Sequence, residues 1–121
     1  MKHFLLLFFI IILVDSVYLY TIKTPFVKMI ESIQKKNIKL RLYSIFLCYL
    51  IVCTCIYNFL WKNKASYKEA FLLGCIIYGV FDTTNYALFR NWDITLSILD
   101  TMWGGVLFSS SLFLMNQISS H

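Results

Sequence analysis

The chain has 121 residues, of which 60% are hydrophobic and only 14% are charged. Soluble domains average about 45–50% apolar and about 25% charged residues. A water-soluble domain of this size would leave large apolar patches exposed to solvent. The composition therefore excludes a soluble enzyme, a disordered chain and a solvated nucleic-acid-binding protein, and it predicts an integral membrane protein.

Four stretches are long and apolar enough to cross a bilayer, because a spanning helix needs about 20 largely apolar residues. Inside lipid, helices are the form that satisfies all backbone polar groups of such segments. We expect spans at residues 4–22, 42–60, 70–89 and 94–114. The remaining segments are short, so the sequence predicts one all-α membrane domain over residues 1–121, built as a four-helix bundle. The first span lacks a small-residue cleavage site, which favours a retained helix over a signal peptide.

The most basic segment of the chain is residues 23–41, between the first two spans. Thr24 followed by Pro25 is typical of a helix start, with an N-cap and then proline at the first helical position. Apolar residues then share one face: Phe26, Met29, Ile30 and Ile33. We predict a short amphipathic helix on the membrane surface, with its lysines near anionic lipid headgroups. A solvated connector is the alternative.

The positive charges also predict an orientation. Four spans place both termini on one side of the membrane, and the opposite side carries more Lys and Arg. Because positively charged loops face the cytoplasm, we expect residues 23–41 to be cytoplasmic and both termini to lie on the other side. This distribution accounts for the net charge of +5 without a nucleic-acid partner. Trp92, beside Arg90, suits the membrane interface as an aromatic anchor.

Three aspartates, Asp15, Asp82 and Asp100, lie inside the expected spans. Each costs about 2.5–3.5 kcal/mol to insert at the centre of a helix, so we expect all three to face the interior of the bundle. The helical rise places each carboxyl group past the middle of its span, toward the predicted cytoplasmic side. The sequence thus predicts a buried polar site at one depth. Close like charges and burial both disfavour ionisation, so we expect at least one of these groups to hold a proton.

Polar neighbours at helical spacing extend this site, because residues three or four apart share a helix face. Hydroxyl, amide and indole N–H groups are suitable donors to a carboxylate held out of water. The side chains that share a face with an aspartate are Tyr18, Tyr78, Asn85 and Trp103. The second span brings Cys48 and Tyr49 to the same depth.

Small residues recur every four positions in the last two spans, a spacing that lets membrane helices approach closely. The two stripes are Cys75, Gly79, Thr83 and Ala87 in the third span and Ser97, Thr101, Gly105 and Ser109 in the fourth. By depth we pair Ala87 with Ser97, Thr83 with Thr101, Gly79 with Gly105, and Cys75 with Ser109. We therefore predict a tight hairpin with the two aspartates of these spans beside its seam. The alternative is that small residues are simply common in membrane helices.

Several motifs together resemble a known family. The third span carries Tyr-Gly-Val-Phe-Asp-Thr-Thr-Asn-Tyr-Ala from Tyr78, and Asn91 and Trp92 follow in the turn. The fourth span carries Asp-Thr-Met-Trp-Gly from Asp100, and the first carries Asp-Ser-Val-Tyr-Leu from Asp15. This combination, which extends over nearly the whole chain, resembles the small predicted membrane proteins grouped as domain of unknown function 2177. The resemblance implies a four-helix membrane protein and supplies no reaction.

The chain departs from the pattern of that family at three positions. Tyr18 stands where the family has Trp, Phe81 where it has Tyr, and Asp93 where it has Pro. Because Phe81 lacks a hydroxyl group, no hydrogen-bonding role carries over to that position.

The sequence leaves three functional hypotheses open. A proton-coupled small-solute carrier would use the intramembrane carboxyl groups as a proton relay, and a carrier this small is expected to act as a homo-oligomer. A structural or assembly protein would use them as a polar core that fixes helix register. The alternative is an intramembrane enzyme acting on a lipid or an isoprenoid, with carboxyl groups as acid and base or as ligands of a divalent cation. The sequence assigns no catalytic residue, metal ligand or cofactor.

Overall fold

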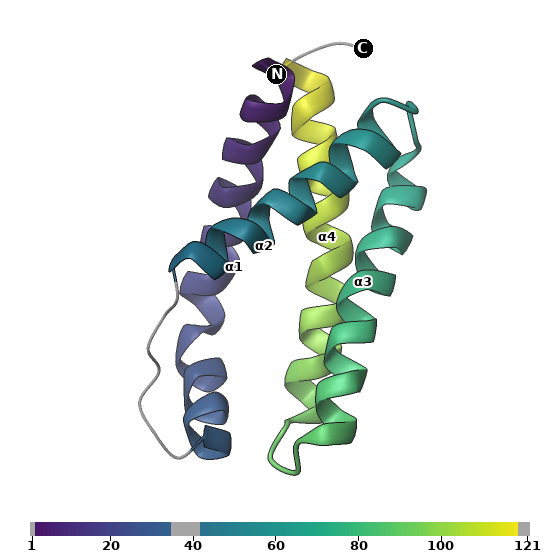
Figure 1. Cartoon of the computed structure of the whole chain (residues 1–121). Coiled ribbons are helices and arrows are strands. Elements are labelled where there is room, and N and C mark those ends of the chain that lie inside the picture. The colour runs from purple at the N-terminus through teal and green to yellow at the C-terminus, as the bar shows by residue number, and fades with distance from the viewer. Residues whose placement is uncertain (1, 35–41, 119–121) are drawn as a thin grey trace.

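The computed structural model describes residues 2–34 and 42–118. Its helices are α1 (Lys2–Gln34), α2 (Leu42–Cys55), the π-helix η1 (Ile56–Trp61) that continues α2, α3 (Tyr67–Leu88) and α4 (Ile94–Ile118). The described residues include no strand, so the all-α class predicted from the sequence is confirmed. α3 and α4 form an antiparallel hairpin, α1 lies along α4, and α2 runs obliquely from α1 toward the start of α3 (Figure 1).

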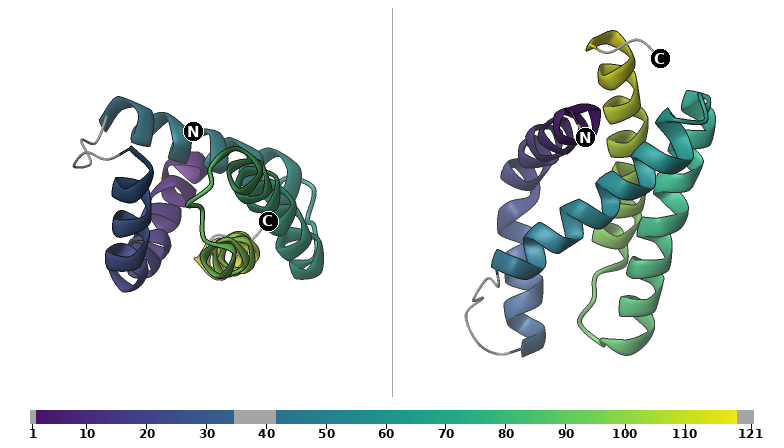
Figure 2. Two further views of the ribbon diagram at one scale, coloured as in Figure 1. Left: turned by 90° about the horizontal axis from the view of Figure 1, so that it is seen from below. Right: turned by 45° about the horizontal axis from the view of Figure 1, so that its top comes forward.

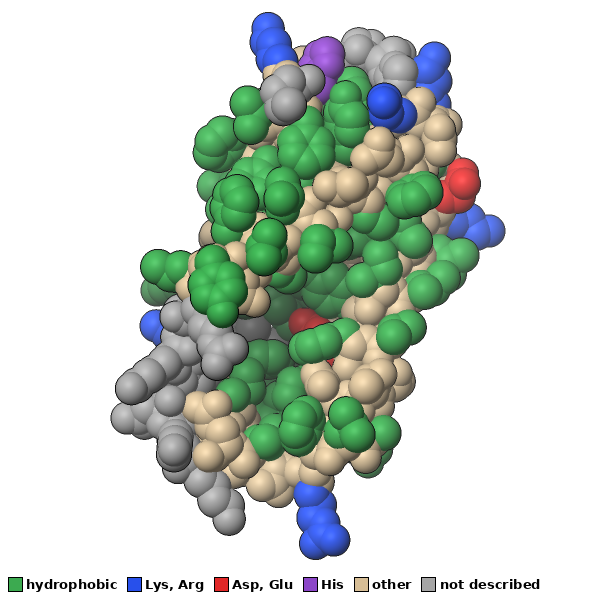
Figure 3. Space-filling view, viewed as in Figure 1, with side chains coloured by type: hydrophobic (Ala, Val, Ile, Leu, Met, Phe, Trp, Pro, Cys, Tyr) green, Lys and Arg blue, Asp and Glu red, His purple; other side chains and the backbone are tan. Residues whose placement is uncertain are grey.

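Four helical segments are long and apolar enough to cross a membrane, and they coincide with the predicted spans apart from a few residues at their ends. They are Lys2–Thr21, Leu42–Trp61, Tyr67–Leu88 and Ile94–Ile118. Large apolar side chains on these segments remain exposed, as lipid-facing surfaces require. Hydrophobic side chains dominate the face shown in Figure 3, and Lys and Arg side chains project from its top and bottom ends.

The basic segment after the first span does not form a separate helix. From Thr24 onward it continues α1 as far as Gln34, with Pro25 inside the helix. An interior proline removes one backbone hydrogen bond and bends a helix. Figure 2 shows the blue C-terminal part of α1 turned away from its purple N-terminal part. The prediction of a separate interfacial helix is therefore wrong for these residues, and the rest of that segment, residues 35–41, lies outside the described residues.

The apolar face of this part of α1 packs against the turn between α3 and α4. The ring centroid of Phe26 lies 5.9 Å from that of Trp92, in an edge-on arrangement. Met29 is buried, and Asn91 in the turn donates a hydrogen bond to Ser32 at 3.1 Å. The sequence pattern indicated the correct apolar face, but protein covers that face where we expected the membrane surface.

Capping groups fix where α3 and α4 begin. Ser66 and Glu69 form a capping box, in which each side chain accepts a hydrogen bond from the backbone N–H of the other residue. Asp93 caps α4, since its carboxylate accepts from the backbone N–H groups of Thr95 and Leu96. The capping box thus fixes the start of α3, and the Asp93 cap fixes the point at which the short turn at residues 89–93 ends and α4 begins.

α3 and α4 approach each other closely at Gly74 and Gly104. A Cβ atom on Gly74 would lie 2.6 Å from the carbonyl carbon of Gly104, and one on Gly104 would lie 2.6 Å from the carbonyl oxygen of Gly74. Side-chain carbon atoms do not tolerate such contacts, so the backbones reach this separation only with glycine at both positions. Neither glycine belongs to the two small-residue stripes predicted from the sequence.

The register of the hairpin differs by one helical turn from the predicted register. A Cβ atom on Gly79 would meet the methyl group of Thr101 at 3.5 Å, and one on Gly105 would lie 2.7 Å from Sγ of Cys75. The predicted pairs Gly79 with Gly105 and Cys75 with Ser109 are therefore wrong. Matching by depth assumes straight, parallel helices, whereas the closest glycine contact sets the actual register.

We expect Gly74→Ala and Gly104→Ala each to lower the free energy of unfolding by about 1–3 kcal/mol, the range for overpacked sites. Gly79→Ala is the matched control, because its added methyl group makes only an ordinary contact and alanine is the better helix former. Thermal unfolding in detergent micelles measures the difference. Equal stability of the three variants would contradict the glycine contact.

Candidate functional site

α1 and α4 are joined by a reciprocal pair of hydrogen bonds between aspartates and aromatic side chains. Nε1 of Trp103 on α4 donates to Asp15 on α1 at 2.8 Å. The hydroxyl of Tyr18 on α1 donates to Asp100 on α4 at 3.2 Å. In both helices the aromatic residue follows its aspartate by three positions and shares its face. Because the two helices are antiparallel, each carboxyl group lies opposite the donor of the other helix.

Two further contacts strengthen this pair. The rings of Tyr18 and Trp103 stack with centroids 4.6 Å apart and planes 6° apart. Tyr49 on α2 donates to the second carboxylate oxygen of Asp15 at 2.5 Å. Asp15, which is 8% exposed, therefore accepts hydrogen bonds from both α2 and α4 and connects three helices.

Asp82 on α3 is enclosed differently. It is 1% exposed, and among the described residues neither of its oxygens has a hydrogen-bond partner of good geometry. Its carboxyl group lies close to the side chains of Asp100, Thr101 and Trp92. The indole N–H of Trp92 is likewise buried without an acceptor in the described part of the chain. Buried polar groups normally have partners, so this carboxyl group beside a second carboxyl group needs a specific explanation.

Of the predicted site residues, Tyr78 and Asn85 make no hydrogen bond to the aspartates among the described residues. The ring of Tyr78 packs on Gly104 of α4 and borders the cavity described next. The side chain of Asn85 is half-buried and takes no part in the hydrogen bonds that the described residues make around the aspartates. The other predicted residues are joined through the three carboxyl groups.

A cavity of about 620 Å³ lies between the four helices, below the oblique course of α2. Asp15 and Asp100 both line it, and most of its remaining wall is apolar. The apolar wall includes Leu47 and Ile51 of α2 and Ile77 and Phe81 of α3. Figure 3 shows a hollow on this face in which an acidic side chain is visible.

A second hollow, of about 280 Å³, lies between α3 and α4. Asp82 lines it together with the hydroxyl-bearing residues Thr83, Ser97 and Thr101. This hollow shares Tyr86 and Ile94 with a third, at the α3–α4 turn. The half of the two predicted small-residue stripes nearer the α3–α4 turn thus borders these two hollows and is not closely packed. Thr83 and Ala87 in this half are exposed.

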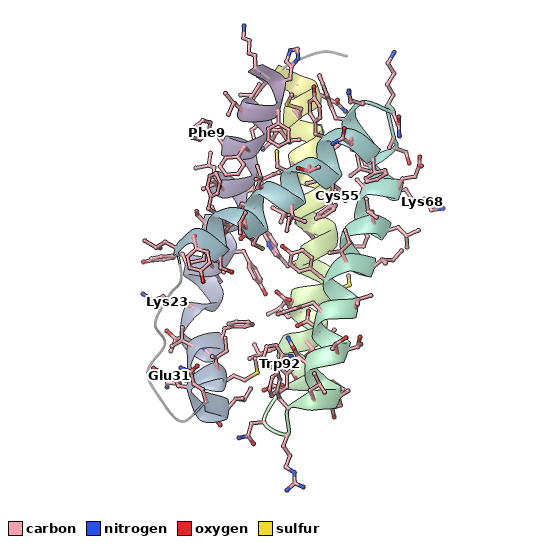
Figure 4. The ribbon with its side chains drawn as sticks, viewed as in Figure 1. Phe9, Lys23, Glu31, Cys55, Lys68 and Trp92 are labelled. Carbon is pink, nitrogen blue, oxygen red and sulfur yellow. The ribbon has the colours of Figure 1, made fainter. Side chains whose placement is uncertain are left out.

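Trp92 is the residue that sequence reasoning placed wrongly. We expected an interface anchor, but Trp92 is 7% exposed and packs against Phe26, Phe81 and Phe89. Figure 4 shows Trp92 between the C-terminal part of α1 and the α3–α4 hairpin. The carboxyl group of Asp82 lies close to its side chain, which adds Trp92 to the site. The tryptophan in the turn belongs to the family motif, which is the signal that could have indicated this role.

We expect Trp103→Phe to lower the free energy of unfolding by about 1.5–3 kcal/mol, because it removes a donor to a buried carboxylate but keeps a ring over Tyr18. Tyr18→Phe is expected to cost less, since its hydrogen bond is longer. Tyr20→Phe is the control, because Tyr20 is 87% exposed. Thermal unfolding in detergent compares the three, and a Trp103→Phe variant as stable as the control would exclude the reciprocal pair.

A family model described as a predicted membrane protein, domain of unknown function 2177, matches residues 1–115. No curated protein and no solved structure matches the chain. The matched region includes all three aspartates, the whole of the first three candidate spans and most of the fourth. The match and the spans together support a multi-pass integral membrane protein. The chain belongs to the domain of unknown function 2177 family of predicted membrane proteins.

Proposed function

We propose that this protein is a multi-pass membrane carrier that exchanges a small solute for a proton held between Asp82 and Asp100. The observation that carries the proposal is that these two carboxyl groups are both buried and lie close to each other. Aspartates inside membrane helices are the usual elements of proton relays.

The proton follows from the surroundings of the pair. Two carboxyl groups in contact and away from water do not both ionise, because their negative charges repel without screening by solvent. Asp82 also lacks a donor of good geometry that would hold it as a carboxylate. A proton shared with Asp100 gives both carboxyl groups a hydrogen bond. When this proton leaves, the pair gains a negative charge that a cationic solute can neutralise.

Each carboxyl group of the pair borders a different hollow. Asp100 lines the 620 Å³ cavity between the helices, and Asp82 lines the 280 Å³ hollow toward the α3–α4 turn. Hydroxyl groups of Thr83, Ser97 and Thr101 line the second hollow and can pass a proton by donating and accepting hydrogen bonds. We propose that the solute occupies the larger cavity and that the proton leaves through the smaller one.

A structural or assembly role is the second candidate, and the reciprocal hydrogen bonds between α1 and α4 favour it. Such a role accounts for Asp15, whose carboxylate has two donors. It does not account for Asp82, because a carboxyl group that serves only packing is expected to have hydrogen-bond partners. The third hypothesis, an intramembrane enzyme acting on a lipid, could use a bound metal ion. Among the described residues, no group of three or more His, Cys, Asp or Glu side chains is placed to hold one.

The proposal includes an orientation and partners in the membrane. By the positive-inside rule, the α3–α4 turn with Arg90 faces the cytoplasm and both termini face the opposite side. Lys23 and Lys28 are exposed on the C-terminal part of α1, where anionic headgroups of the cytoplasmic leaflet would attract them. We propose a homo-oligomer as the working unit, because four spans make a small carrier.

Infrared spectroscopy of the protein in lipid bilayers tests the proton site. As the pH rises from mildly acidic to mildly alkaline, we expect the band of a protonated carboxyl group to disappear in the wild type. Asp82→Asn is expected to remove this band, whereas Asp93→Asn is expected to keep it, because Asp93 is exposed at the start of α4. A wild-type spectrum that does not change with pH would refute the carrier mechanism.

Stability separates the two candidate functions. We expect Asp82→Asn to leave the thermal stability unchanged or to raise it, because the native carboxyl group has no donor to lose. Asp15→Asn is expected to cost about 1–3 kcal/mol, because it weakens the hydrogen bonds from Tyr49 and Trp103. A purely structural role predicts the opposite result for Asp82→Asn, namely a clear loss of stability.

A further inference from the structure

We infer that the 620 Å³ cavity binds a cationic amphiphile, with its charged head at Asp15 and Asp100 and its apolar body against α2 and α3. This inference rests on the proposed carrier function and names the class of solute that the carrier takes.

The volume and the lining of the cavity fit a small molecule that is apolar along most of its length. Pockets for small molecules enclose about 300–1,000 Å³ and combine apolar walls with a few polar groups. Here Leu47, Ile51 and Ile77 form part of an apolar wall, and the two carboxyl groups are the only acidic side chains among the described lining residues. A ligand that fills this space needs an apolar body and one polar head.

The sign of the head follows from the charges in the cavity. The described residues that line it include two aspartates and no Lys, Arg or His. Among the described residues, the hydrogen-bond donors to these aspartates are the neutral groups of Tyr18, Tyr49 and Trp103, which bring no positive charge. A buried carboxylate without a counter-charge attracts a cation and repels an anion.

Aromatic rings add to this preference. Tyr18 and Tyr78 both line the cavity beside the aspartates. The faces of such rings attract ammonium groups, and the attraction grows when the cation has left water. An alkylammonium head between these rings and the carboxyl groups therefore gains from both interactions, whereas a hydroxyl or carboxylate head does not.

The cavity opens toward the surface that faces lipid. Its wall residues Ile51 and Phe81 are 68% and 51% exposed, so they belong both to the cavity and to the apolar surface of the candidate spans. In Figure 3 the hollow lies near mid-height of the molecule, away from its charged ends, and hydrophobic side chains border it above and to its right. An amphiphile dissolved in the membrane can enter here without crossing a polar surface.

Equilibrium binding of radiolabelled dodecyltrimethylammonium to the full chain in lipid nanodiscs tests the inference, with empty nanodiscs to subtract partitioning into lipid. Dodecanol and dodecanoate, which have neutral and anionic heads on the same chain, are the comparison probes. We expect saturable binding of the cation and at least about tenfold weaker binding of the other two probes. Equal binding of the three probes, or no saturable binding of the cation, would overturn the inference.

Two pairs of variants locate the bound probe. Asp100→Asn is expected to weaken cation binding about tenfold, whereas Asp93→Asn, outside the cavity, is expected to leave it unchanged. Ile77→Trp fills the cavity and is expected to abolish binding, whereas Ile76→Trp adds the same group to an exposed position of α3 that does not line it. Retained binding in both Asp100→Asn and Ile77→Trp would place the probe elsewhere.

The binding measurement uses no proton gradient, so it fails independently of the proposed function. If cation binding is absent but the carboxyl band still titrates, the ligand class is wrong and the proton site stands. If the cation binds but the band does not titrate, the cavity binds its ligand without coupling to a proton.

Discussion

A carboxyl group in an apolar protein needs either hydrogen-bond partners or a proton, and this requirement organises the molecule. Asp15 has partners: donors from α2 and α4 hold its two oxygens and tie three helices together. Asp100 receives one donor from α1 and lies against Asp82, which has none of good geometry. The three aspartates thus differ in role. Asp15 is a structural group with its hydrogen bonds satisfied, whereas Asp82 is, in the proposed function, a group that exchanges a proton.

The packing of the helices gives the three aspartates these different surroundings. The glycine contact holds α3 close to α4, and the buried Asp82 of α3 lies close to Asp100 of α4. The reciprocal aspartate–aromatic pair then fixes α1 on the other side of α4, and the C-terminal part of α1 covers the hairpin turn and Trp92. Since α2 runs obliquely (Figure 1), it supplies Tyr49 to Asp15. Leu47 and Ile51 of the same helix line the lateral cavity.

The sequence predicted the spans, because apolar length is enough to recognise them, and it singled out three aspartates, because their insertion cost requires partners. Helical spacing also indicated Tyr18 and Trp103 as donors. The hairpin register was not predictable from depth, since the Gly74 contact depends on how the helix axes incline. The amphipathic pattern after Pro25 identified an apolar face, but a pattern on one helix does not reveal whether lipid or another helix covers it.

The central claim is that a cation entering the cavity displaces the proton held by Asp82 and Asp100. The most direct measurement is the internal pH of proteoliposomes that contain a pH-sensitive dye, after dodecyltrimethylammonium is added outside. Entry of the cation against exit of protons makes the interior more alkaline in the wild type, while Asp82→Asn and protein-free liposomes give no change beyond passive leak. An identical response of the wild type and Asp82→Asn would contradict the account.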